Sequence, residues 1–132
     1  MSGSAAYLDT SAFVKLVVAE PESAALTRYL RQWPARASAA LLRAEALRAV
    51  GVHGQTHVAA ARRLFGGLHL VTLDDALLER AGELRPDAMR ALDAIHVAAA
   101  LALGSDLGVV VTYDDRLAEA ARAQGLEVAR PA

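Results

Sequence analysis

Short apolar segments alternate with longer helical patterns along the whole chain, and this alternation constrains the fold more than any other feature. The apolar segments predict strands at residues 5–8, 36–38, 69–72, 109–112 and 127–129. The helical patterns cover residues 11–18, 22–32, 40–50, 55–64, 75–84, 92–103 and 115–124. Strands that alternate with helices pair in parallel through right-handed crossovers. The sequence therefore predicts an α/β fold, a three-layer sandwich with a central parallel sheet.

Length and composition favour one packed domain. The 132 residues suit a single domain over positions 1–132, and 55% of them are hydrophobic, which is ample for a packed interior and argues against a disordered chain. Cysteine is absent, so a disulfide framework and a thiolate metal site are both excluded. No signal peptide or membrane-spanning segment is recognisable in the sequence, and we expect a soluble cytoplasmic protein.

The basic residues are almost all arginine. Lys15 is the only lysine among 14 basic residues, and the net charge is −1. If four acids are gathered in one site, the rest of the molecule carries about three surplus positive charges, which could hold a polyanion around an acidic pocket. A coding bias toward arginine and alanine would produce the same composition, so the arginines alone do not decide between the two explanations.

Two of the predicted strands are followed closely by an acidic residue. Asp9 follows the strand at 5–8, and Asp114 lies two residues after the strand at 109–112. We predict that these strands are adjacent, parallel and central. Ligands bind beyond the carboxyl ends of strands in open α/β sheets, so the two carboxylates would converge there. The alternative is that each aspartate caps the helix that follows it.

Two further acids occur in helical segments rich in alanine and leucine. Glu45 lies one turn after Leu41, and Asp93 lies one turn before Val97 on the apolar side of its helix. A solvent-exposed pair of Glu45 with Arg48 and a capping role for Asp93 are the alternatives. If all four acids are instead partly buried together, they require a neutralising partner.

A divalent metal ion would neutralise such a cluster. Crowded carboxylates raise one another's pKa unless a cation balances their charge. Mg²⁺ or Mn²⁺ fits a site built from carboxylate oxygens, whereas the histidines are poorly placed for zinc. Mg²⁺ in such a site commonly also binds phosphate oxygens. The acids therefore indicate phosphodiester hydrolysis by metal-activated water.

Four segments resemble motifs of PIN-domain nucleases, in the family's order and over almost the whole chain. Residues 8–16 resemble the opening motif, and closely that of the VapC toxins of bacterial toxin–antitoxin pairs. Residues 92–100 and 112–117 resemble the third and fourth acidic motifs, and Glu45 occupies the place of the second. The first, third and fourth motifs are specific in combination, whereas a lone glutamate on a helix is a looser match.

The resemblance implies an Mg²⁺- or Mn²⁺-dependent endoribonuclease, the toxin of a type II toxin–antitoxin pair, that forms a homodimer and is inhibited by a small antitoxin protein. The catalytic carboxylates would be Asp9, Glu45, Asp93 and Asp114, with Asp9, Asp93 and Asp114 as metal ligands. Ser11 and Thr112 would supply hydroxyls that orient these carboxylates or the metal's water ligands. Asp115 is an alternative to its neighbour Asp114.

We assign structural roles to the remaining polar residues. We predict that His53 and His57 are surface residues and that His96 is hydrogen-bonded and partly buried. We predict that Asp74 and Asp75 cap a helix and that Lys15 forms an ion pair with an acid such as Glu20.

An aspartyl-nucleophile phosphotransferase and a receiver domain would both need a lysine late in the chain, which this sequence lacks. A catalytically inactive PIN-fold interaction module and a housekeeping RNA-processing nuclease are the alternatives to a toxin.

Overall fold

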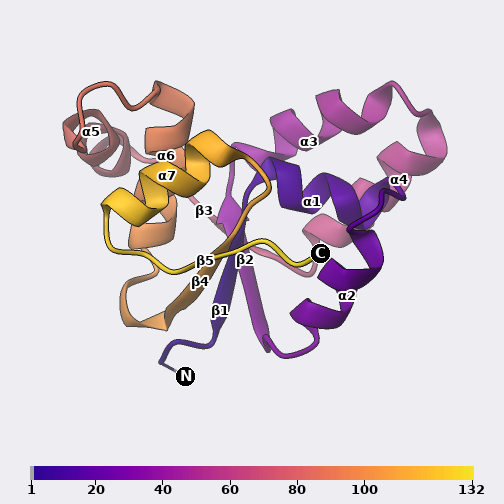
Figure 1. Ribbon diagram of the computed structural model, residues 1–132. Coiled ribbons are helices and arrows are strands. Elements are labelled where there is room, and N and C mark those ends of the chain that lie inside the picture. The colour runs from indigo at the N-terminus through magenta and orange to yellow at the C-terminus, as the bar shows by residue number, and fades with distance from the viewer. Residues whose placement is uncertain (1) are drawn as a thin grey trace.

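A five-stranded parallel sheet forms the centre of the molecule (Figure 1), as the sequence predicted. The computed structural model describes residues 2–132. The strands are β1 (Ala5–Leu8), β2 (Ala35–Ala39), β3 (His69–Val71), β4 (Leu107–Val111) and β5 (Val128–Ala129), in the spatial order β3-β2-β1-β4-β5. β1 lies in the middle and pairs in parallel with β2 and β4. The predicted adjacency of the first and fourth strands is therefore confirmed.

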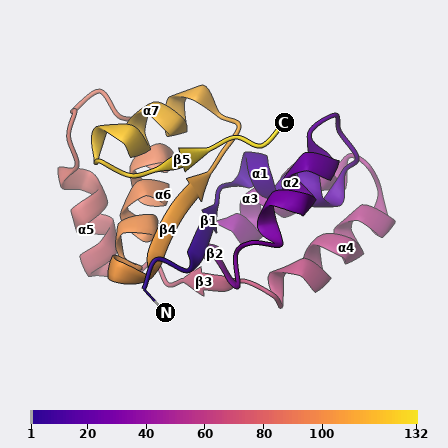
Figure 2. The same ribbon diagram turned by 60° about the horizontal axis from the view of Figure 1, so that its bottom comes forward.

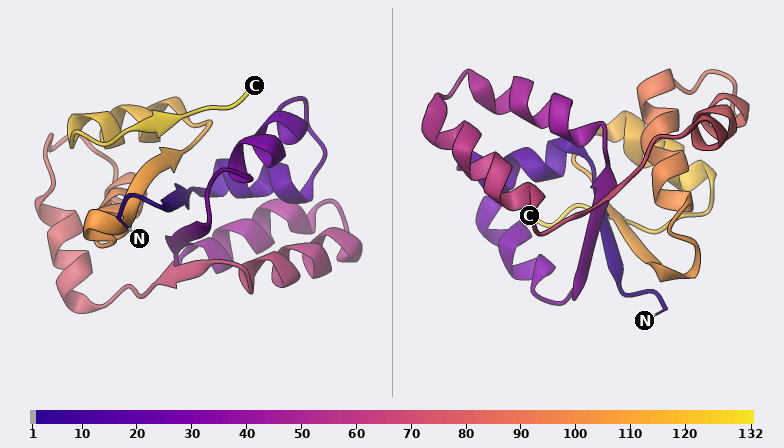
Figure 3. Two further views of the ribbon diagram at one scale, coloured as in Figure 1. Left: turned by 90° about the horizontal axis from the view of Figure 1, so that it is seen from below. Right: turned by 180° about the vertical axis from the view of Figure 1, so that it is seen from behind.

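Helices cover both faces of the sheet and give the predicted three layers. They are α1 (Thr10–Val17), α2 (Ser23–Leu30), α3 (Leu42–Gly51), α4 (Gln55–Phe65), α5 (Asp75–Glu83), α6 (Ala91–Leu101) and α7 (Asp115–Ala123), with a short 3₁₀ helix at Gly104–Asp106. Figures 1 and 2 show α5, α6 and α7 on one face and α1 to α4 on the other, and the view from behind in Figure 3 agrees. Apolar residues of every strand face one or both layers, and β4 lacks polar alternation because it is covered on both faces.

Side chains of β1 alternate between the two helical layers. Tyr7 is fully buried against small residues of α6, and Leu8 is fully buried against α1 and α2. Alanine is frequent in α6, where Ala94, Ala98 and Ala99 let the helix lie close to the sheet. This close approach brings the first turn of α6 to the carboxyl edge of β1 and β4.

Gly108 marks a second close approach, at the start of β4. A Cβ atom at this position would overlap the ring of Trp33 and the carbonyl oxygen of Gly3. Only glycine fits between these groups without displacing them. The N-terminal segment and the turn after α2 are thus packed directly against the strand that carries part of the site.

None of the helices within residues 2–132 has the length and apolar character required to cross a membrane.

Candidate active site

The carboxyl ends of β1 and β4 lie side by side. Leu8 is paired with Val111, and the next backbone amide, that of Asp9, donates to the Val111 carbonyl at 3.3 Å. Asp9 and Thr112 consequently leave the two strands at the same edge of the sheet, where α1 begins and where α7 begins after a short turn. This is the convergence that the two strand-terminal acids predicted.

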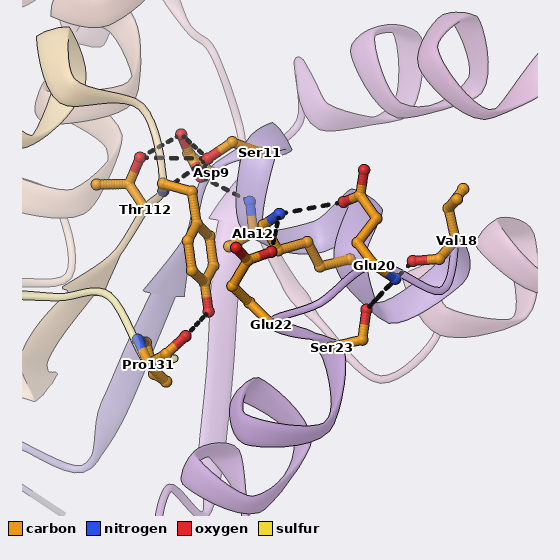
Figure 4. Close-up of polar contacts among 11 residues, drawn as sticks. Asp9, Ser11, Ala12, Val18, Glu20, Glu22, Ser23, Thr112 and Pro131 are labelled. Atoms are coloured by element: carbon orange, nitrogen blue, oxygen red, sulfur yellow. Dashed lines mark hydrogen bonds and ion pairs between the residues drawn. The ribbon is translucent and has the colours of Figure 1, made fainter.

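The carboxylate of Asp9 is buried and is held by neutral donors (Figure 4). It accepts hydrogen bonds from the Ala12 amide at 3.0 Å, from the Ser11 hydroxyl at 2.8 and 3.0 Å, and from the Thr112 hydroxyl at 2.6 Å. Burial raises the pKa of Asp9, and these hydrogen bonds offset only part of that effect. Asp9 also caps α1, so this residue both caps a helix and lies at the site.

Ser11 and Thr112 connect the two strand ends as well as orienting Asp9. The Ser11 hydroxyl accepts from the Tyr113 amide at 2.9 Å, and the Thr112 hydroxyl accepts from the Asp114 amide at 3.0 Å. The two hydroxyl oxygens are 3.3 Å apart. Both residues contact Asp9 as the sequence predicted, and together they fix the loop that carries Asp114.

Glu45 points from the first turn of α3 toward α6 rather than into solvent. Its Oε1 atom accepts from the Thr10 hydroxyl at 2.6 Å and lies 2.8 Å from His96 Nε2. Burial would raise the pKa of Glu45, but the hydrogen bonds from His96 and Thr10 outweigh it and lower the pKa below its ordinary value. The alternative of a surface pair with Arg48 is wrong, because Glu45 bonds these two residues instead.

Asp93 and Asp114 face each other across the site. Asp93 is half-buried in the first turn of α6, and its pKa is raised first by burial and then by the negative charge of Asp114. Asp114 is exposed and caps α7, accepting from the amides of Arg116 at 2.8 Å and Leu117 at 3.3 Å. Capping is thus correct for Asp114, whereas the cap position of α6 belongs to Arg90 and not to Asp93.

All four predicted carboxylates line one hollow of about 400 Å³ at this edge of the sheet. Ser11 and His96 also line it, and two arginines, Arg90 and Arg116, stand at its rim. Asp115 does not line it, because its carboxylate forms an ion pair with Arg130 at 2.7 Å. The geometry therefore favours Asp114 over the alternative at 115.

A model of the PIN domain family matches residues 6–123. This chain belongs to the PIN-domain family. It is 50% identical to ribonuclease VapC46 of Mycobacterium tuberculosis strain H37Rv, over 96% of this chain and 98% of that protein. It is 38% identical to ribonuclease VapC47 of strain CDC 1551, over 95% of this chain and 96% of that protein. The crystal structure of M. tuberculosis VapC20, a toxin that cleaves the sarcin–ricin loop, superposes with a TM-score of 0.76 at 20% identity and covers 96% of this chain and 99% of that one, which supports the fold.

The donor atoms of this PIN-domain site suit a hard divalent cation. Within residues 2–132, no group of three or more His, Cys, Asp or Glu side chains is gathered closely enough to hold a metal ion on its own. Carboxylate and hydroxyl oxygens nevertheless surround the hollow, and buried Asp9 has only neutral hydrogen-bond donors. An ion such as Mg²⁺ keeps several waters and needs only one or two direct carboxylate ligands. The residues therefore fit Mg²⁺ or Mn²⁺ at a largely hydrated site.

Sequence reasoning missed two features of the site. His96 was expected to be buried and hydrogen-bonded, which is correct, but its contact with Glu45 was not foreseen. Arg90 and Arg116 were not distinguished from the other arginines. Their positions gave a signal, since Arg90 lies three residues before Asp93 and Arg116 two residues after Asp114.

The other structural assignments are confirmed, with two corrections. Lys15 pairs with Glu20 at 3.2 Å, as predicted, and with Glu22 at 2.8 Å (Figure 4). Asp74 caps α5 through the Leu77 amide, while Asp75 is the first residue of that helix and not a cap. The prediction of surface histidines is correct for one of the two. His53 is exposed, but His57 is half-buried against it and its Nδ1 atom is buried without a hydrogen-bond partner.

Proposed function

We propose that this PIN-domain protein is a metal-dependent endoribonuclease and the toxin of a type II toxin–antitoxin pair. The observation that carries the proposal is the hollow itself. Four carboxylates from α3, α6 and the ends of β1 and β4 line it, in a chain 50% identical to a protein named a ribonuclease. A catalytically inactive interaction module would have no need to keep all four.

Asp9, Asp93 and Asp114 are the residues that would hold the ion, and Mg²⁺ or Mn²⁺ is the expected cofactor. When bound, the ion supplies activation of water and neutralises charge on the phosphodiester. Asp9 is held in one orientation by Ser11, Thr112 and the Ala12 amide, so its position does not have to be established during the reaction. The Asp114 carboxylate is exposed to solvent and can therefore bind the ion.

Glu45 and the rim arginines have different roles. Glu45 is deprotonated, fixed by Thr10 and His96, and lines the hollow, so it can accept a proton from the attacking water. Arg90 and Arg116 present guanidinium groups at the rim, where they can pair with phosphate oxygens on either side of the cleaved bond.

The family membership also supports proposals about partners. We expect a small cognate antitoxin that occupies the carboxylate hollow, a homodimer in solution and action in the cytoplasm, where the RNA substrate is found. A housekeeping RNA-processing nuclease would share the chemistry but would have no antitoxin.

The decisive experiment measures RNA cleavage by the purified chain in Mg²⁺, in Mn²⁺ and in EDTA. Cleavage should require either ion and stop in EDTA, whereas undiminished cleavage in chelator would exclude the proposed mechanism.

Controlled expression in a bacterial host tests the toxin role. The parent should arrest growth and Asp93→Asn should not, while growth unaffected by an active parent would favour the housekeeping nuclease.

A further inference from the structure

A second hollow adjoins the carboxylate hollow, and Arg90, Asp93 and Arg116 line both. It lies between the segment 86–90, which precedes α6, and one face of α7, and has a volume of about 250 Å³. Its far wall is largely apolar, with Met89 and Ala120 among its residues. Sites for drug-sized ligands measure about 300–1,000 Å³. The second hollow is therefore sized for a single flat ring system next to the reaction site.

Three charged side chains around this hollow form no hydrogen bond or ion pair within residues 2–132, although the charges of Arg90 and Arg116 act on nearby Asp93. Arg90, Arg116 and Glu119 make no side-chain hydrogen bond or ion pair there, although other charged residues such as Lys15 do. Arg116 and Glu119 are three residues apart on α7 and so lie on one face of the helix. The two arginines stand at the boundary between the hollows, and Glu119 stands on the far side. These charges are available to a ligand that extends from one hollow into the other.

We propose that the second hollow binds the guanine base of the nucleotide next to the cleaved phosphodiester. The inference rests on the proposed ribonuclease function and extends it to the choice of base. The phosphate of that nucleotide pairs with Arg90 and Arg116, and its base leaves the RNA stack and enters the hollow. Single-stranded RNA is commonly recognised through such unstacked bases, by contact with the base face and hydrogen bonds to its edge.

The chemistry of Glu119 selects guanine among the four bases. An ionised carboxylate only accepts hydrogen bonds, and it offers two oxygens side by side. Guanine presents two adjacent donors, N1–H and the N2 amino group, on its Watson–Crick edge. Adenine, cytosine and uracil each present one donor group there. Arg116 can donate to the O6 atom of guanine, and the apolar side chains of Met89 and Ala120 contact the base face.

Cleavage of a matched RNA panel tests the choice of base. The cleavage position on a single-stranded RNA is mapped first, and the nucleotides on either side are then varied among guanosine, inosine, adenosine, cytidine and uridine. Inosine lacks only the N2 amino group. At one flanking position the parent should prefer guanosine to inosine by about 5- to 150-fold in kcat/KM, the discrimination expected of a good bidentate pair. In Glu119→Gln the ratio should fall to about one, because the amide has a single acceptor oxygen and cannot accept from both donors of guanine.

A control variant and a cleavage-free measurement complete the test. Glu79→Gln removes an exposed carboxylate from α5, outside both hollows, and should keep the parent's ratio. In EDTA, RNA with 6-thioguanosine at the selected position should photocross-link to peptides containing residues 86–90 or 116–123. Equal cleavage of guanosine and inosine RNA, or cross-links to other segments, would overturn the inference and leave the ribonuclease function standing. A parent protein that cleaves no RNA would exclude both the ribonuclease function and the choice of base.

Discussion

The imidazole Nε2 atom of His96 lies 2.8 Å from Oε1 of Glu45, and the two residues come from different helices, α6 and α3. The other ring nitrogen, Nδ1, lies 2.7 Å from the hydroxyl of Tyr7, a buried residue of β1. Glu45 is ionised and can only accept, so Nε2 carries the hydrogen of this pair. Burial raises the pKa of Tyr7, and its hydroxyl therefore remains protonated and can donate to Nδ1. The orientation of the Glu45 side chain is therefore fixed by His96, which is itself held by buried Tyr7.

Tyr7→Phe should lower RNA cleavage about tenfold, because loss of outer contacts to a metal or catalytic ligand typically costs 10–100-fold. The ring still fills its place in the core, but His96 Nδ1 loses its donor and the imidazole is no longer held in one tautomer. Long-range ¹H–¹⁵N NMR spectra should show the hydrogen on Nε2 in the parent and a mixture of tautomers in the variant. Tyr29→Phe, on α2 and away from the site, is the control. An unchanged tautomer and an unchanged rate in Tyr7→Phe would exclude this role.

The aspartates of the hollow should be essential to cleavage and their neighbour should not. Asp9→Asn, Asp93→Asn and Asp114→Asn keep the side-chain shape but remove a charged oxygen, so each should reduce cleavage by orders of magnitude. Asp115→Asn should cleave like the parent, because Asp115 pairs with Arg130 outside the hollow. Asparagine caps helices about as well as aspartate, so the loss cannot be attributed to the ends of α1 or α7. An active Asp114→Asn combined with an inactive Asp115→Asn would reverse the assignment.

The features that the sequence predicted correctly depend on local pattern and strand order. The segment at 109–112 was recognised from its unbroken apolar run, and the observed strand, Leu107–Val111, differs by two residues at its start and one at its end. Asp9 and Asp114 could be placed at one edge because parallel neighbouring strands end on the same side of a sheet. No side-chain coordinates were needed for that prediction.

The features that the sequence did not predict depend on how helices far apart in the chain approach each other. His96 and Glu45 are separated by 51 residues, and their contact requires both the angle between α3 and α6 and particular side-chain rotamers. The choice between Asp114 and Asp115 depended on Arg130, which follows β5 near the C-terminus. The prominence of Arg90 and Arg116 among 13 arginines likewise appears only when the hollows are formed.

Gly108→Ala should destabilise the protein without changing the chemistry of the site. The added methyl group would overlap the Trp33 ring and the Gly3 carbonyl, and such overpacking typically costs about 1–3 kcal/mol of unfolding free energy. Thermal and urea unfolding measure the loss. Gly82→Ala in α5 is the matched control, because a Cβ there meets no atom within 4 Å, and it should leave stability unchanged or raise it slightly. Equal stability of the two variants would mean that the close approach at β4 relaxes without cost.

Asp93→Asn should stabilise the metal-free protein at neutral pH, although it abolishes cleavage. Burial and the charge of Asp114 raise the pKa of Asp93 above its ordinary value of 3.8. A raised folded-state pKa means that the protonated form favours folding below pH 3.8 and that this contribution is lost as pH rises through the folded pKa. At pH 7 in EDTA the parent therefore bears the full cost of the ionised carboxylate, and the variant does not. The melting temperature of the variant should exceed the parent's at pH 7, and the difference should shrink as pH falls toward 4.

Added Mg²⁺ should reverse the order of the two proteins. An ion that binds only the folded state stabilises it in proportion to the logarithm of its concentration above the dissociation constant. The parent's melting temperature should rise with Mg²⁺ and that of Asp93→Asn should rise much less, since a ligand is missing. Asp74→Asn, which alters a helix cap outside the hollow, should follow the parent in both buffers. If EDTA and Mg²⁺ give the same difference between parent and Asp93→Asn, Asp93 does not take part in holding the ion.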